Sequence, residues 1–333
     1  MKRHLQLVLG IAVSAAAVWY TMKDVKLGEV AAALRGANYL GFLIAMLCTL
    51  AGFWLRAVRW RYLLANVKRV GVASLYSATM IGFMANNLLP LRLGEFVRAW
   101  ALGRKESISK TTAFATVVVE RVVDMVTLLC ILGLALLVHP LSESTQAGRM
   151  TRAGATALLL TCVGLTGVVV ALEKVPARAH AAAALLARPL PQGMRDRGAK
   201  LLDNFLSGLS LFADLGRLAM VMLLSFVMFG VVVLGIHVSL WAMGIEVPWY
   251  GGLVMLVITA IGIMVPAAPG YIGTMNLACV AGLALFDVPK SAATSFSWLY
   301  WASQYLPVTV VGLYYLRREG LSLRQLGTAP KGE

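Results

Sequence analysis

The stretch "NNLLPLRLGEFVRAW", residues 86–100, decides the fold of this chain, because it places a helix break and charges inside apolar sequence. It holds a proline, a glycine, a glutamate and two arginines. A proline inside a helix removes a backbone hydrogen bond, and lipid offers no water to replace it. Such backbone is tolerated in a membrane only where protein buries it or where it lines a wet cavity. The stretch therefore predicts a turn at membrane depth.

The composition around this stretch is typical of an all-α polytopic membrane protein. Of the 333 residues, 59% are hydrophobic and 14% are charged, whereas soluble domains carry roughly 25% charged residues. The net charge of +15 comes from basic residues that gather in loops. This placement indicates the positive-inside bias and attraction to anionic lipid headgroups, and not binding to nucleic acid.

Histidine and cysteine spacings predict neither a metal site nor another cofactor. The four cysteines form no C-x-x-C pair, and the four histidines show no H-E-x-x-H spacing. All four cysteines lie in apolar segments, where they are expected to be reduced packing residues.

Apolar runs and basic loops predict the topology. Runs of about 20 residues are long enough to cross the hydrocarbon core. If basic loops stay inside, the interrupted segments 72–102 and 250–286 must enter and turn back as re-entrant hairpins. Both termini are then cytoplasmic, in a bacterial inner (plasma) membrane. Six full spans are predicted, at 5–22, 39–63, 112–138, 153–172, 218–243 and 292–316.

Two segments outside this pattern have alternatives. A cleaved signal peptide is the alternative for 5–22, but the apolar run continues through Trp19 and Tyr20, which favours an anchored helix. Segment 173–217 is predicted to be cytoplasmic and basic. Its part 201–215 is expected to form an amphipathic surface helix, or simply to cap the bundle.

The two hairpins resemble each other at one offset, which predicts an internal repeat within a single domain, 1–333. Pro269 follows Pro90, and Gly273 follows Gly94, by 179 positions. The same shift carries the spans that flank the first hairpin onto those that flank the second. The repeats, at about 39–138 and 218–316, are expected to be inverted in the membrane. The alternative is that the breaks are kinks in ordinary spans. The predicted break residues are Pro90, Gly94, Pro266, Pro269, Gly270 and Gly273.

Span 112–138 carries charges that must face the protein interior. Glu120 and Asp124 share one helix face, and Arg121 lies three positions before Asp124. Each charge costs roughly 2.5–3.5 kcal/mol at the membrane centre. Arg56 and Arg59 are instead interpreted as snorkelling residues at the interface.

These charges predict one central polar cavity that admits an anionic headgroup, because guanidinium groups bind phosphate with two parallel hydrogen bonds. The alternative is an ion-pair network that only locks the bundle. The inward-facing amides are as typical of helix–helix hydrogen bonds as of a site. The candidate site residues are Arg92, Glu95, Arg98, Glu120, Arg121, Asp124, Asn86, Asn87, Asn276 and Gln304.

Three motifs together resemble the flippase-like membrane family, which includes the membrane domain of MprF-type lysylphosphatidylglycerol synthases. They are "NNLLPLRLGEFVRAW", "VVVERVVDMVTLL" and "PAAPGYIGT", and the resemblance covers about residues 5–316. It implies movement of an anionic or amino-modified lipid headgroup between leaflets, in hopanoid, glycolipid or aminoacyl-lipid pathways. The linked motif residues are Pro90, Arg92, Gly94, Glu95, Glu120, Arg121 and Asp124.

Two departures from the family pattern bear on the function. The chain ends about 17 residues after the last predicted span, so synthase activity is not expected. Asn276 stands where the family commonly has a glutamate, which argues against a carboxylate role in the second hairpin. A stand-alone lipid flippase, and no enzyme, is therefore the leading interpretation, with membrane lipids and lipid-synthesis enzymes as partners and the oligomeric state left open.

Two other classes of function remain as alternatives. One is a polytopic glycosyltransferase or other lipid-modifying membrane enzyme, and the other is a non-catalytic subunit of a lipid-synthesis complex. An enzyme of the first kind needs an acidic residue on an outer loop. The candidates for it form no D-x-D pair and are Asp24, Glu29, Glu143 and Glu246.

Overall fold

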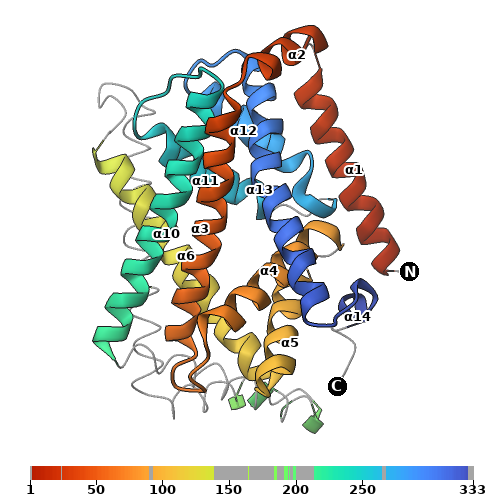
Figure 1. Ribbon diagram of the computed structural model, residues 1–333, viewed down its shortest axis with the longest axis vertical. Helices are drawn as coiled ribbons and strands as arrows, with labels where there is room; N and C mark the ends of the chain where they lie inside the picture. The colour runs from red at the N-terminus through yellow and green to blue at the C-terminus, as the bar shows by residue number, and fades with distance from the viewer. Residues whose placement is uncertain are drawn as a thin grey trace. The chain divides into compact units, whose positions relative to one another are not determined.

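The computed structural model describes residues 2–23, 25–89, 93–138, 214–264 and 268–328, with isolated residues between 164 and 199. Every regular element in these ranges is helical, as expected for an all-α protein (Figure 1). The elements are α1 (Lys2–Met22), α2 (Leu27–Gly36), α3 (Tyr39–Leu63), α4 (Val72–Leu88), α5 (Gly94–Glu106), α6 (Lys110–Val138), α10 (Leu215–Ala242), α11 (Gly251–Met264), the 3-10 turn η3 (Pro269–Tyr271), α12 (Thr274–Ala284), α13 (Lys290–Arg318) and α14 (Leu323–Thr328).

Several of these helices match the predicted spans in length. Among the described residues, α3 and residues Gly216–Ala242 of α10 are long and apolar enough to cross a membrane. Helices α6 and α13 have 29 residues each, or about 43 Å at 1.5 Å per residue. The predicted span 153–172 and the surface helix 201–215 fall almost wholly outside the described residues. The count of six spans stays a prediction.

Each interrupted segment is a pair of helices. Helix α4 is followed by α5, and α11 is followed by η3 and α12. At the second break Gly270 and Gly273 have φ values of 75° and 89°, in the left-handed region that glycine adopts without strain. The break residues Pro90 and Pro266 lie outside the described residues.

The two helices of each pair come back together at their outer ends. Lys68, just before α4, donates a hydrogen bond to the carbonyl of Glu106, the last residue of α5, at 2.6 Å. Lys105 donates to the Ser77 hydroxyl at 3.1 Å. In the second pair the ring of Tyr250, just before α11, lies 6.0 Å from the ring of Phe286, just after α12. Each pair is therefore a hairpin.

The helix boundaries recur at the offset found in the sequence. A shift of 179 moves the start of α4 to the start of α11, and the end of α3 to the end of α10. The same shift moves the starts of α5 and α6 to positions one residue before α12 and α13. The structure thus contains two matched runs of four helices. Their inverted orientation in a membrane stays a prediction.

Contacts divide the chain into two compact units. Unit 1 contains Met1–Trp54, Thr79–Val97 and Met228–Glu333, and unit 2 contains Leu55–Ala78 and Arg98–Val227. Within unit 1, α12 packs against α1, α11 and α13, and α13 also packs against α2 (Figure 1). A Cβ at Gly262 of α11 would collide with Ala278 of α12. Small residues of this kind let helices approach closely in membrane proteins.

Unit 2 places charged and polar side chains of three helices, α3, α5 and α10, around α6. The second half of α3, the second turn of α5 and the first half of α10 each contribute a residue with a polar contact in this region. On α6, Glu120 and Asp124 are four positions apart within otherwise apolar sequence, and this spacing puts both on one helix face. This face carries the candidate site.

Candidate functional site

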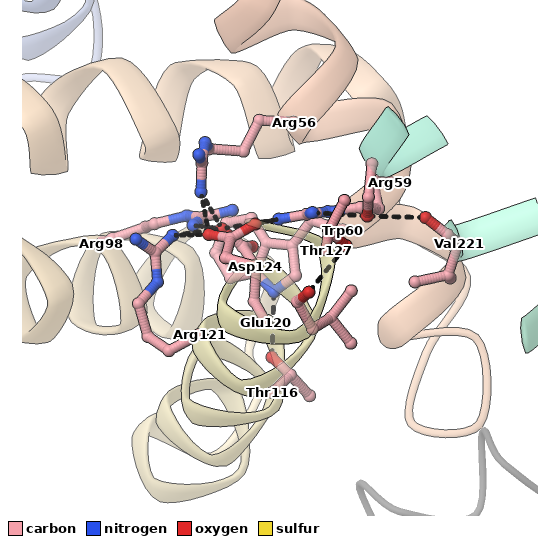
Figure 2. A network of polar contacts seen from close by, with 12 residues as sticks. Arg56, Arg59, Trp60, Arg98, Thr116, Glu120, Arg121, Asp124, Thr127 and Val221 are labelled. Atoms are coloured by element: carbon pink, nitrogen blue, oxygen red, sulfur yellow. Dashed lines mark hydrogen bonds and ion pairs between the residues drawn. The ribbon is translucent and has the colours of Figure 1, made fainter. Parts of the chain in front are cut away.

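A cluster of six charged side chains lies inside unit 2 (Figure 2). We call it the arginine cluster. Its members are Arg56 and Arg59 on α3, Arg98 on α5, and Glu120, Arg121 and Asp124 on α6.

Glu120 is the hub of the cluster. Its Oε1 lies 2.7 Å from Nη1 of Arg56 and 2.8 Å from Nη1 of Arg98. The same atom lies 2.7 Å from Nη2 of Arg121 and 3.5 Å from Nη2 of Arg59. The Glu120 side chain has no exposed surface. Four guanidinium groups therefore converge on one carboxylate oxygen.

Asp124, one turn further along α6, binds three of the same arginines. Its Oδ2 lies 2.9 Å from Nη1 of Arg56 and 3.1 Å from Nη2 of Arg121. Its Oδ1 lies 2.7 Å from Nη2 of Arg59. Arg56 and Arg121 each bridge both carboxylates with one nitrogen, so the two acids act as a single anionic platform.

Neutral side chains fix the orientation of two of the arginines. The guanidinium of Arg98 lies over the ring of Trp60, 3.7 Å from its centroid. Trp60 in turn donates from Nε1 to the Thr116 hydroxyl at 2.9 Å. Arg59 donates from Nη1 to the Ser225 hydroxyl of α10 at 2.7 Å. These contacts restrict the orientation of both guanidinium groups.

The cluster carries more positive than negative charge. Four arginines, which stay protonated in proteins, face two carboxylates, which leaves an excess of two positive charges. Within the described part of the chain, Nε and Nη2 of Arg98 and the Nε atoms of Arg59 and Arg121 have no hydrogen-bond partner, and neither has Oε2 of Glu120. Arg98 is only 2% exposed. Buried donors without partners are costly unless something else binds them.

Comparison with known proteins gives the family. The lysylphosphatidylglycerol synthase TM region matches residues 7–312. This chain belongs to that family. It is similar to the UPF0104 membrane protein of Pyrococcus horikoshii, with 24% identity over 339 residues, which is 96% of this chain and 98% of the relative. A UPF0104 membrane protein of Methanothermobacter thermautotrophicus is 35% identical over 100 residues, 29% of this chain and 30% of that relative.

The prediction that Arg56 and Arg59 snorkel to the membrane interface is wrong. Arg59 is fully buried and the Arg56 side chain is 13% exposed. Both bind the carboxylates of α6, so their charge lies in the protein interior. They are three positions apart on α3, and this spacing, which places both on one helix face, was the available sequence signal.

Four of the predicted site residues meet in the arginine cluster. Arg98, Glu120, Arg121 and Asp124 lie together as predicted. Glu95 is half-buried in the first turn of α5 and belongs to unit 1. Arg92 lies outside the described residues. The predicted cavity around these charges stays a prediction.

Two of the predicted site asparagines, Asn86 and Asn276, accept hydrogen bonds from backbone N–H groups at the helix breaks of unit 1. Asn86 accepts a hydrogen bond from the backbone N–H of Gly94 at 2.7 Å. A Cβ at Gly94 would collide with the Asn86 side chain, so the glycine is needed for this contact. Asn276 accepts from the N–H of Gly273 at 3.0 Å and donates to the Ser297 hydroxyl at 3.0 Å.

The other two amides join helices. Asn87 donates to the Thr309 hydroxyl of α13 at 2.9 Å. Gln304 donates to the Thr49 hydroxyl of α3 at 2.9 Å. Hydrogen bonds of this kind between helices are typical of membrane proteins. The amides therefore have structural partners, whereas the arginine cluster keeps donors without any among the described residues.

Proposed function

We propose that this protein is a lipid transporter of the flippase type, which moves lipids with anionic headgroups between the leaflets of its membrane. The observation that carries the proposal is the excess of two positive charges in the arginine cluster, with buried guanidinium N–H groups that have no partner among the described residues. The family supports it, since its name refers to the membrane region of a phospholipid synthase.

A purely structural ion-pair network explains the cluster less well. Locking a helix bundle needs one cation for each anion, and each further buried cation adds a desolvation cost of several kcal/mol. An arriving phosphate offsets that cost, because guanidinium groups bind it with charge-assisted hydrogen bonds. Arg121 supplies an entry point, since its side chain is 40% exposed while Arg59 and Glu120 are fully buried.

A leaflet-exchange assay tests this proposal. Purified protein is reconstituted into liposomes that contain tail-labelled phosphatidylglycerol, phosphatidic acid or phosphatidylcholine, and exchange is followed by quenching of the outer leaflet. We expect the protein to accelerate exchange of an anionic lipid at least tenfold over protein-free liposomes, and to act less on phosphatidylcholine. Equal rates with and without protein, for every anionic lipid, would refute the transport function.

For the topology, we propose that the α4–α5 and α11–α12 hairpins are re-entrant and enter from opposite faces, with both termini cytoplasmic. The hairpin shape of each segment is supported by the contact between Lys68 and Glu106 in the first and between Tyr250 and Phe286 in the second. In an inverted repeat such broken helices meet near the membrane midplane, where transporter sites lie. Irregular backbone at that depth requires burial in protein or a wet cavity.

Cysteine labelling should place the two hairpins on opposite sides. In a background without the four native cysteines, Val67→Cys and Ser109→Cys flank the first hairpin, and Glu246→Cys and Leu285→Cys flank the second. We expect a membrane-impermeant maleimide to modify the first pair only from the cytoplasmic side and the second pair only from the other side. If the two members of either pair react from different sides, that segment crosses the whole bilayer and the re-entrant topology is wrong.

A further inference from the structure

We infer that the arginine cluster binds a phosphomonoester dianion, as the headgroup of a lipid, in preference to the monoanionic phosphodiester of common phospholipids. This inference rests on the proposed function and names the class of headgroup. Four positive and two negative side chains meet in the cluster, so a ligand with two negative charges makes its total charge zero. A monoanion would leave one buried positive charge uncompensated, which is costly.

The compactness of the cluster favours a ligand that carries both negative charges on one phosphorus. Nitrogens of all four arginines lie within 3.5 Å of the single atom Oε1 of Glu120. A diphosphate would spread its two charges over two phosphorus atoms, whereas a phosphomonoester carries them on three oxygens around one centre. The donors are therefore arranged for one doubly charged group.

The N–H donors for the phosphate belong to arginines whose orientation is fixed by other contacts within the protein. Arg98 uses Nη1 for Glu120 and one face for Trp60, and its Nε and Nη2, which share one edge of the guanidinium, have no partner among the described residues. This edge offers the parallel pair of N–H donors that suits two phosphate oxygens. Arg121 presents a further buried Nε from α6. Two helices thus supply the phosphate contacts.

The charge state of the ligand gives the inference a distinctive pH dependence. The second pKa of a phosphomonoester is about 6, so the dianion makes up about a tenth of the molecules at pH 5 and nearly all of them at pH 8. A phosphodiester stays a monoanion over this range. Among the described residues, the charged groups with contacts in the cluster are the six side chains named above, and the contact from α10 there is the neutral hydroxyl of Ser225. Any change with pH in the affinity for a phosphodiester must therefore come from titration of the protein, so the phosphodiester is the control.

The test measures binding of short-chain lipids to the full-length protein in uncharged detergent by titration calorimetry. Dihexanoyl phosphatidic acid is the phosphomonoester probe, dihexanoyl phosphatidylglycerol is the phosphodiester probe, and inorganic phosphate is the probe without acyl chains. We expect the affinity for phosphatidic acid to rise about tenfold from pH 5 to pH 8, while that for phosphatidylglycerol stays constant and at least tenfold weaker at pH 8. Arg98→Lys should remove most of the difference, and Arg104→Lys, at an exposed position of α5, should preserve it.

Each of the other possible outcomes contradicts a different part of the inference. If phosphatidylglycerol binds as tightly as phosphatidic acid at pH 8, the preference for a dianion is wrong, while transport of anionic lipids still stands on the leaflet-exchange assay. If inorganic phosphate binds as tightly as phosphatidic acid, the ligand is free phosphate and the lipid part is wrong. If none of the three probes binds, the cluster is structural and the inference fails, whatever the exchange assay shows.

Discussion

Replacing Glu120 with glutamine is expected to destabilise the protein by about 3–5 kcal/mol, the range for breaking a buried charge pair by removing one partner. Oε1 of Glu120 lies within 2.8 Å of nitrogens from Arg56, Arg98 and Arg121. An amide keeps the shape but not the charge, so four guanidinium groups would face Asp124 alone. A thermal-unfolding assay in detergent should show a melting temperature lower by roughly 10 °C.

A second variant separates charge from shape. Arg98→Met in the Glu120→Gln background removes one positive charge and restores the wild-type excess of two, so we expect it to recover part of the lost stability. Glu106→Gln is the matched control, because Glu106 pairs with Lys68 at 3.3 Å outside the cluster and solvent-accessible pairs contribute roughly 0–1 kcal/mol. If Glu120→Gln melts at the wild-type temperature, the ion pairs of the cluster do not hold unit 2 together.

The sequence predicts the helices and four of the six members of the arginine cluster for identifiable reasons. The length of apolar runs and the cost of broken backbone in lipid place the helices and the two breaks, and α3 has the predicted bounds of 39–63. The i, i+4 spacing of Glu120 and Asp124 within an apolar helix requires an interior position. Local periodicity and burial cost therefore account for the correct predictions.

The sequence does not predict which side chains meet when their helices are far apart along the chain. Arg56 is seven residues from the end of α3, close enough that a snorkelling side chain is an equally good interpretation of the sequence alone. Its partners, Glu120 and Asp124, are 64 and 68 positions away, and no local pattern on α3 points to them. Trp60 was not predicted as part of the site, because an apolar helix gives no sign of which aromatic ring an arginine will lie over.

Arg98→Lys is expected to slow leaflet exchange of an anionic lipid at least tenfold without unfolding the protein. Lysine keeps the positive charge near Glu120, so the ion pair that stabilises unit 2 is retained. It loses the flat group that lies over Trp60 and the edge formed by Nε and Nη2. Hydrogen bonds to charged groups contribute roughly 1.5–3 kcal/mol each, which corresponds to at least a tenfold change in rate. The exchange assay and a melting curve are measured on the same preparation.

Two companion variants make the result for Arg98 specific. Arg104→Lys makes the same chemical change on the same helix, at an exposed residue whose guanidinium lies 5.8 Å from the Trp100 ring centroid, and should exchange lipid at the wild-type rate. Trp60→Phe keeps an aromatic ring under Arg98 but removes the hydrogen bond to Thr116, so its rate should fall between wild type and Arg98→Lys. If Arg98→Lys is folded and exchanges lipid as fast as wild type, the unpartnered edge of Arg98 does not bind the headgroup. The excess arginines would then serve only the stability of the bundle.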